Sequence, residues 1–217
     1  MKKIFNTVKI NGKEYPYIQD TVLLGSWEVV TDTKASEITH RDNDTETLHG
    51  LIFKGYEMKW NATNTNGERY EQGAFEKFIK TYFVDKGFNM PVTLEHSYNP
   101  IDIVGRVLYI EVNTVGFYFV VYVPDTCPIY NQVKWLAEQG LIQGFSKEGY
   151  VTDGEWIEES RDSWYYLIRE IMMTRISLVC TPANGVKFER TEEIKNSVAY
   201  IDKTKKESVL RSIIKHK

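Results

Sequence analysis

The stretch WYYLIREIMMTRISLV, residues 164–179, decides how this sequence is interpreted as a fold. Aromatic and β-branched residues dominate it, and such residues favour β-strands. The strand is long enough to break or bend, which we expect within residues 172–175. Residues 142–152 form a second strand-like stretch, and this one carries the segment GFSKEGY. The whole chain has 14 Tyr, 10 Phe and 5 Trp, a composition that also favours a β-rich body.

Further strands and two helices are expected around this pair. Strand-like runs cover residues 48–60, 91–94, 101–112 and 115–123, and a turn at residues 113–114 suits a hairpin between the last two. Apolar spacing predicts a helix over residues 73–84, and a proline start and a glycine stop predict another over 128–140. Residues 1–48 are interpreted as two or three short strands or turns followed by a polar tract.

Composition excludes several classes of protein. The chain has 217 residues, enough for one domain, and its 42% hydrophobic and 26% charged residues are ordinary for a globular protein. The net charge of −3 is too near zero to suggest general binding of nucleic acid or membrane. Cys127 and Cys180 form no CxxC or Cys/His cluster, so a disulfide framework or zinc site is not expected. With no signal peptide or membrane span predicted, we expect a reducing, cytoplasmic setting.

His96 is the best placed of the four histidines for catalysis. It follows the apolar run MPVTL and precedes the loop SYNP, and a general base is usefully held at the tip of a buried strand. By position alone, a structural, hydrogen-bonded histidine is the slightly better interpretation. His40, His49 and His216 are poorer candidates, because they lie in a polar tract, at a strand start and next to the chain end.

Ser146 lies within GFSKEGY, between a predicted helix and a predicted strand. Its flanking glycines permit close approach by a substrate backbone. The segment is not the GxSxG nucleophile elbow, because the order of elements and the spacing differ. Alone, it is weak evidence for a nucleophile.

Four motifs in order carry a resemblance to a known family. They are GAF at residues 73–75, LEHS at 94–97 with Pro100 and Gly105 after it, GFS with GY at 144–150, and ISLV at 176–179 followed by PAN. Together they resemble the prohead serine proteases of tailed phages, whose fold is similar to that of herpesvirus assemblin. The resemblance spans residues 48–186.

The resemblance implies a fold and a division of the chain. We expect an α+β fold, mostly an antiparallel β-barrel with a few surrounding helices. Residues 48–188 would form the protease domain, residues 1–47 an N-terminal extension with short strands and a polar loop, and residues 189–217 a basic, amphipathic C-terminal tail. A homodimer is expected from the resemblance alone.

The resemblance also implies an activity. Ser146 would be the nucleophile and His96 the general base of a serine endopeptidase that needs no metal or organic cofactor. Its substrates would be the major capsid protein and the scaffold protein, and it would act in the host cytoplasm inside the assembling prohead. Membrane partners are not expected, and nucleic acid is not an expected partner.

Two departures from the family pattern bear on the rest of the site. Many members have an acid directly before the ISLV segment, where this chain has Arg175. Glu170 is the nearest acid on that strand and is our candidate third catalytic residue, with Glu95 and Asp102 as other acids near His96. Arg175 would support the oxyanion site or form a surface salt bridge. The second departure, Lys147-Glu148, predicts a more polar neighbourhood for Ser146.

Two other functional classes compete with a protease. One is a catalytically inactive capsid-assembly or scaffold protein that retains the fold, an interpretation that Arg175 favours. The other is a nucleic-acid-binding module, which rests only on the basic residues between positions 203 and 217. Salt-sensitive DNA binding that needs those residues would favour the latter.

Overall fold

The computed structural model describes residues 6–39, 44–57, 60–61, 63–64, 66–87, 89–114 and 116–180. All of them belong to one unit, residues 1–185. The second unit, residues 186–217, lies outside the described residues, as do the PAN segment, His40 and His216. The basic tail and its role therefore stay predictions.

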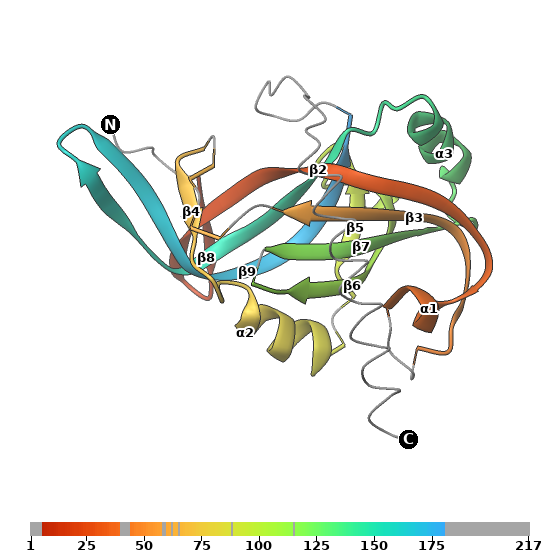
Figure 1. Cartoon of the computed structure of the whole chain (residues 1–217), viewed down its shortest axis with the longest axis horizontal. Helices are drawn as coiled ribbons and strands as arrows, with labels where there is room; N and C mark the ends of the chain where they lie inside the picture. Colours follow the sequence, from red (N-terminus) through yellow and green to blue (C-terminus); the bar gives the residue numbers. More distant parts are fainter. Residues whose placement is uncertain are drawn as a thin grey trace. The chain divides into compact units, whose positions relative to one another are not determined.

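The described strands form one large sheet, with few helices beside it (Figure 1). The strands are β1 (Asn6–Ile10), β2 (Lys13–Lys34), β3 (Thr47–Glu57), β4 (Glu68–Tyr70), β5 (Pro91–Leu94), β6 (Ile103–Val112), β7 (Phe117–Pro124), β8 (Gly144–Ser160) and β9 (Ser163–Val179). The helices are α1 (Ala35–Thr39), α2 (Glu76–Phe78), which continues as a π-helix over Ile79–Val84, a 3₁₀ turn at Pro100–Asp102, and α3 (Tyr130–Glu138). The helices predicted over residues 73–84 and 128–140 are thereby confirmed.

The order of strands across the sheet is β1-β2-β3-β7-β6-β5-β9-β4, and β8 pairs with both β2 and β9. Most pairs are antiparallel, but β4 and β5 both run parallel to β9. Parallel neighbours need a long connection, and here β6, β7, α3 and β8 separate β5 from β9 in the chain. The sheet is therefore mixed and is not a closed antiparallel barrel, so that part of the predicted fold is not confirmed.

The N-terminal region differs from the expected short strands. β2 is a single strand of 22 residues that changes its neighbour along its length. Its first half pairs with β8, from Tyr17 opposite Tyr150 to Leu23 opposite Gly144. Its second half pairs with β3. The two pairings meet at Leu23 and Leu24, so β2 passes from one neighbour to the other without leaving the sheet.

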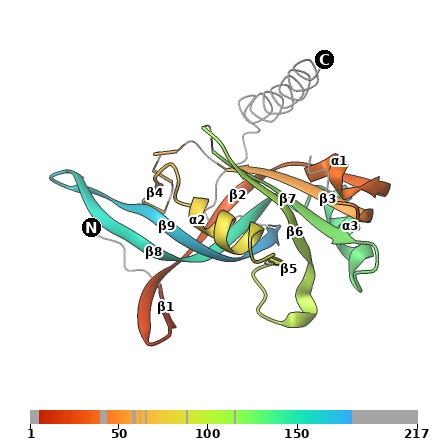
Figure 2. The ribbon, with the colours of Figure 1, turned by 90° about the horizontal axis from the view of Figure 1, so that it is seen from below.

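An apolar core covers one face of β8 and β9. α2 packs against β9 (Figure 2), and Phe78 of this helix and Phe75 directly before it are both 1% exposed. Phe145 of β8 is fully buried and its ring meets that of Phe119 edge-on, with centroids 4.7 Å apart. Burying such side chains stabilises the fold by about 1.5–3 kcal/mol each.

A β-bulge at Thr174 decides which side chains of β9 face this core. Glu148 pairs with Arg175, but the next residue of β8, Gly149, pairs with Met173, so Thr174 has no partner across the ladder. The core-facing residues are accordingly Ile171 and Met173 before the bulge and Ile176 and Leu178 after it. The break predicted near residues 172–175 is thus a bulge in a continuous strand, and it turns the side chains of Arg175 and Ser177 away from the core.

Candidate active site

Polar side chains occupy the face of β5, β8 and β9 that lies opposite the apolar core. These residues are buried although they are polar or charged, with exposed fractions from 0% to 8%. We call them the polar cluster: Thr93, Ser146, Glu148, Arg175 and Ser177. Buried polar groups are stable only when they are hydrogen-bonded, so the contacts within the cluster fix its geometry.

Strand register brings the cluster together. Ser146 lies directly opposite Ser177 across the β8–β9 ladder, and Thr93 of β5 lies beside Ser177 on its other flank. Residues opposite each other in a ladder share a face. The hydroxyls of Thr93 and Ser177 are 2.9 Å apart, and the Ser177 hydroxyl donates to Glu148 Oε1 at 3.1 Å. Ser146 and Glu148 share this face because they are two residues apart on β8.

Glu148 is the centre of the hydrogen-bond network. Its Oε1 lies 3.1 Å from Nδ1 of His96, and its Oε2 accepts from Nη2 of Arg175 at 2.6 Å and from the Tyr17 hydroxyl at 2.5 Å. Burial raises the pKa of this carboxyl, but the hydrogen bonds from His96, Arg175 and Tyr17 outweigh burial and lower it to about 2. Glu148 is therefore an ionised carboxylate held against an imidazole.

The loop that carries His96 is fixed from two sides. Glu95 and His96 have φ angles of 49° and 59°, in the left-handed region that non-glycine residues rarely adopt, so β5 cannot continue past Leu94. Nη1 of Arg175 donates to the carbonyl of Ser97 at 2.8 Å, and its guanidinium stacks on the Tyr98 ring at 3.6 Å. Arg175 thus ties the loop to the sheet and turns His96 towards Glu148.

The structure places His96, Ser146 and Arg175, three residues predicted from sequence, at the polar cluster. Arg175 is not a surface ion pair, because it is 8% exposed and pairs with the fully buried Glu148. Glu170 lies elsewhere. Its carboxylate accepts from Lys77 Nζ at 2.8 Å and from the Thr152 hydroxyl at 2.5 Å.

The other acids considered near His96 also have different partners. Glu95 accepts a hydrogen bond from the backbone N–H of Cys180, and Asp102 accepts from the Ser97 hydroxyl at 2.5 Å. The acid that contacts His96 is Glu148, so the sequence interpretation found the wrong neighbour for the histidine. The signal was present: two-residue alternation from Ser146 places Glu148 on the same face.

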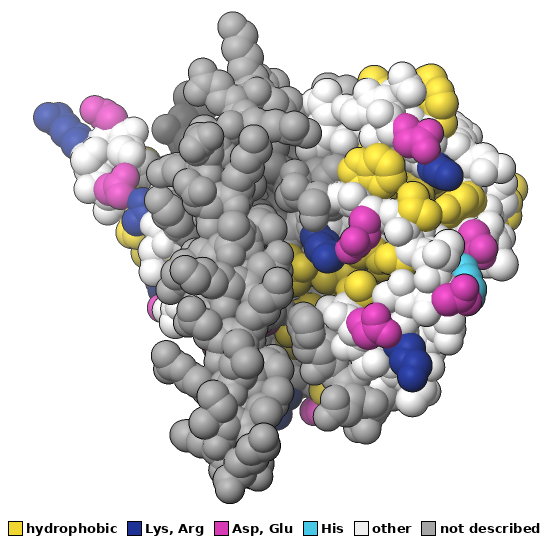
Figure 3. Space-filling view, turned by 45° about the vertical axis from the view of Figure 1, so that its right-hand side comes forward, with side chains coloured by type: hydrophobic (Ala, Val, Ile, Leu, Met, Phe, Trp, Pro, Cys, Tyr) yellow, Lys and Arg dark blue, Asp and Glu magenta, His cyan; other side chains and the backbone are white. Residues whose placement is uncertain are grey.

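The arrangement has the groups that acyl transfer needs, a hydroxyl, an imidazole and a carboxylate that orients it. Among the residues that the structure describes, no cluster of His, Cys, Asp or Glu could hold a metal ion. No helix within that same part of the chain is long and apolar enough to cross a membrane. On the face shown in Figure 3, acidic, basic and apolar side chains are interspersed.

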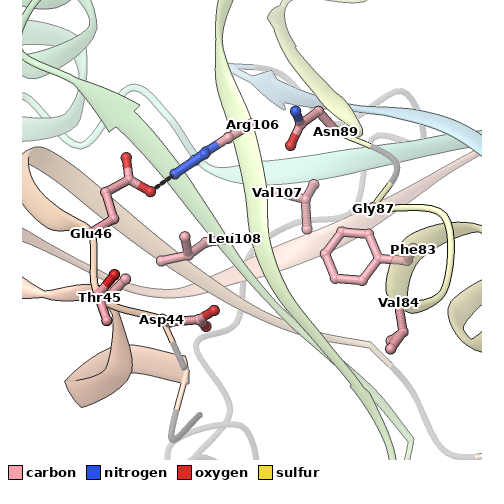
Figure 4. Close-up of a pocket in the computed structure, with 11 residues that line it drawn as sticks. Asp44, Thr45, Glu46, Phe83, Val84, Gly87, Asn89, Arg106, Val107 and Leu108 are labelled. Atoms are coloured by element: carbon pink, nitrogen blue, oxygen red, sulfur yellow. Dashed lines mark hydrogen bonds and ion pairs between the residues drawn. The ribbon is translucent and has the colours of Figure 1, made fainter. Parts of the chain in front are cut away.

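Two pockets lie near or beside this sheet. The first, of about 460 Å³, adjoins the polar cluster and is lined by Thr7, Val8, Tyr17, Tyr98, Thr174 and Arg175. The second, of about 430 Å³, lies between β6, residues 44–46 and the end of the π-helix at Phe83 and Val84, and Arg106 points towards Glu46 and pairs with it (Figure 4). The second pocket contains none of the predicted catalytic residues.

The mostly β fold and a hydroxyl, an imidazole and a carboxylate on one face are consistent with a serine protease, and comparison with known proteins supplies the class and the family. The family model for the caudovirus prohead serine protease matches residues 36–206, which is more than half of the chain. The chain therefore belongs to the caudovirus prohead serine protease family, and it is a serine protease of phage capsid maturation that acts within the assembling capsid.

A solved structure shares the fold. The bacteriophage T4 capsid assembly protease gp21 matches with a TM-score of 0.57 and 15% sequence identity, over 76% of this chain and 98% of that chain. At this identity the likeness is one of fold alone. No curated protein matches the sequence.

Proposed function

We propose that this protease cleaves the major capsid protein and the scaffold protein during prohead maturation, with Ser146 as nucleophile, His96 as general base and Glu148 as the carboxylate that orients His96. One observation carries the proposal. The buried Glu148 carboxylate contacts Nδ1 of His96, and Ser146 stands on the same face of β8. Glu148 takes the place that sequence reasoning gave to Glu170.

The proposed mechanism uses both nitrogens of His96. Nδ1–H donates to Glu148, and Nε2 is the nitrogen that takes the proton of the Ser146 hydroxyl as its oxygen attacks the scissile carbonyl. The protonated imidazole then gives that proton to the departing amine. Water, deprotonated by the same nitrogen, hydrolyses the ester on Ser146. Glu148 remains ionised throughout, consistent with its pKa of about 2.

Ser146 is a better nucleophile candidate than its neighbour Ser177. The Ser177 hydroxyl donates to Glu148 and also bonds Thr93, so its proton is held by a carboxylate and not by the base. Ser146 also lies in the GFS segment that resembles the family's nucleophile strand. Ser177 then helps to position Glu148.

Arg175 fits a positioning role better than direct contact with substrate through its side chain. Both terminal nitrogens already have partners, Glu148 and the Ser97 carbonyl. The guanidinium supplies the charge that keeps Glu148 ionised and the link that holds the His96 loop. An oxyanion role for Arg175 and a homodimeric assembly remain predictions from the family resemblance.

The test is cleavage in the presence of the natural substrates. The full chain is expressed with its capsid and scaffold proteins, and new N-termini are identified by mass spectrometry. We expect Ser146→Ala and His96→Ala to lower the cleavage rate by at least about 10³-fold, because such residues act as a unit. Ser177→Ala is the matched control, equally buried and directly opposite, and should lower the rate by about tenfold or less.

The competing function is an inactive assembly protein that keeps the fold. Fragment patterns that are the same in the wild type and in Ser146→Ala would support it and exclude the protease mechanism. An equal loss in Ser146→Ala and Ser177→Ala would instead move the nucleophile assignment into doubt. Salt-sensitive DNA binding measured on the full chain would be needed to revive a nucleic-acid role.

A further inference from the structure

We propose that the pocket beside the polar cluster is a substrate subsite that binds an apolar side chain within about three residues of the scissile bond. This inference rests on the proposed function, because it takes Ser146 as the point of attack. It adds the chemical class of one substrate side chain and the residues that select it.

The pocket and the polar cluster share a boundary. Tyr17 and Arg175 both line it, and both also bond Glu148. Glu148 lies two residues from Ser146 on β8, which is about 7 Å at the usual rise of a strand. An extended substrate has about the same rise per residue as β8. Side chains one to three positions from the scissile bond can therefore reach the pocket.

The chemistry of the wall favours an apolar ligand. The Tyr17 hydroxyl donates to Glu148, and both terminal nitrogens of Arg175 have partners within the protein. What remains for a ligand is the ring surface of Tyr17, the part of the Tyr98 ring that Arg175 leaves uncovered, and the methyl groups of the other lining residues, Thr7, Val8 and Thr174. A volume of about 460 Å³ is within the range of sites that enclose a small ligand, so even a large side chain is accommodated.

One wall of the pocket comes from residues that the family model does not include. Thr7 and Val8 of β1 and Tyr17 of β2 precede residue 36, where the family match begins. The polar cluster, by contrast, lies wholly within the matched range. We therefore infer that this chain sets its preference at this subsite with N-terminal residues of its own.

The test is the sequence preference of cleavage, measured on a library of proteome-derived peptides with the full chain. Cleaved bonds are read by mass spectrometry, and residue frequencies are compared at each position around them. We expect the wild type to enrich Leu, Ile, Val, Met or Phe at one position within three residues of the cleaved bond, by about fivefold or more. Ser146→Ala provides the background that is subtracted.

Val8 and Lys9 offer a matched pair of substitutions on β1. Val8 lines the pocket and is partly buried, whereas Lys9 is exposed and does not line the pocket. Val8→Glu should abolish the apolar enrichment at that one position and favour Lys or Arg there, whereas Lys9→Glu should leave the profile unchanged. Val8→Ala, which only enlarges the pocket, should shift the preference towards larger apolar side chains.

The outcomes separate the two proposals. Ser146-dependent cleavage with the same profile in the wild type, Val8→Glu and Val8→Ala would overturn the subsite and leave the proposed mechanism intact. Cleavage that persists in Ser146→Ala, or no cleavage by the wild type, would overturn the proposed mechanism and the subsite with it. Thermal unfolding of each variant shows whether Val8→Glu has lost its fold, in which case the Val8→Ala profile decides.

Discussion

The two faces of the β8–β9 ladder are built from alternating residues of the same strands, yet they are buried for different reasons. One face carries Phe145, Ile176 and Leu178 and packs into the apolar core. The other carries the polar cluster, in which Ser146 and Glu148 are as fully buried as Phe145. Burial alone therefore does not distinguish the core from the site.

The difference lies in what each face needs from its neighbours. Apolar contacts are non-directional, so the apolar positions of the core face, such as Phe145, tolerate substitution as long as volume is kept. A buried ion pair is different, since each charge loses its hydration and depends on its partner's position. Glu148 and Arg175 illustrate this dependence, because each also bonds groups of the His96 loop or of β2. The polar face is thus specific where the core face is adaptable.

The largest effect is expected from Glu148→Ala, which leaves Arg175 buried without its carboxylate and His96 without its orienting group. We expect a loss of about 3–5 kcal/mol in the free energy of unfolding and a cleavage rate near that of His96→Ala. Urea unfolding and fragment analysis measure the two effects. The double substitution Glu148→Leu with Arg175→Met should recover most of the stability but no cleavage. Recovery of both would show that the pair is only structural.

Substitutions on the core face are expected to change cleavage less than substitutions in the polar cluster. Phe145→Ala should lower the free energy of unfolding by about 3–5 kcal/mol, because it leaves a cavity next to Phe119. Phe145→Leu should cost less than this and leave cleavage per folded molecule within a few-fold of the wild type. Denaturant unfolding and cleavage at a temperature where both variants are folded check this. A loss of cleavage in Phe145→Leu as large as in Glu148→Ala would break the distinction between the faces.

The smallest expected effect is the response to acid. The pKa of Glu148 falls from 4.5 to about 2 on folding, so its contribution is fully present above pH 4.5 and is lost as pH falls through 2. Free energies of unfolding measured between pH 6 and pH 2 should fall more steeply for the wild type than for Glu148→Gln. Parallel curves would mean that another carboxylate governs the acid response.

Much of this arrangement is predictable from sequence. The strands and helices follow from apolar periodicity, and motif order placed His96 and Ser146 at one site. The acid beside His96 is not evident from sequence, because the acid nearest to Arg175 along β9 is Glu170. The structure shows that the neighbour of Arg175 is across the ladder, at Glu148, and contact across strands depends on register.

The bulge in β9 explains a second feature that the sequence does not predict, which is the face on which each β9 side chain lies. Strict alternation assigns Glu170 to the face of Thr174 and not to that of Arg175. The extra residue at position 174 interrupts this alternation. Counting alternate residues from one end of β9 therefore assigns the wrong face to residues beyond the bulge. Nothing in the local sequence MMTRI marks Thr174 as the residue that has no partner across the ladder. Its position follows from how β8 and β9 pair over their full length.

The change of neighbour along β2 has a consequence for biosynthesis. Residues 17–23 emerge from the ribosome early, but their partner strand β8 follows more than a hundred residues later. Such long-range pairing forms late, since the intervening loop must close first. Strand β8, which carries the proposed nucleophile Ser146, thus pairs with β2 and β9 only when nearly the whole described chain has been made. The proposed site on β8 therefore forms after the strands that flank it, and cleavage by Ser146 is expected only once this part of the sheet is complete.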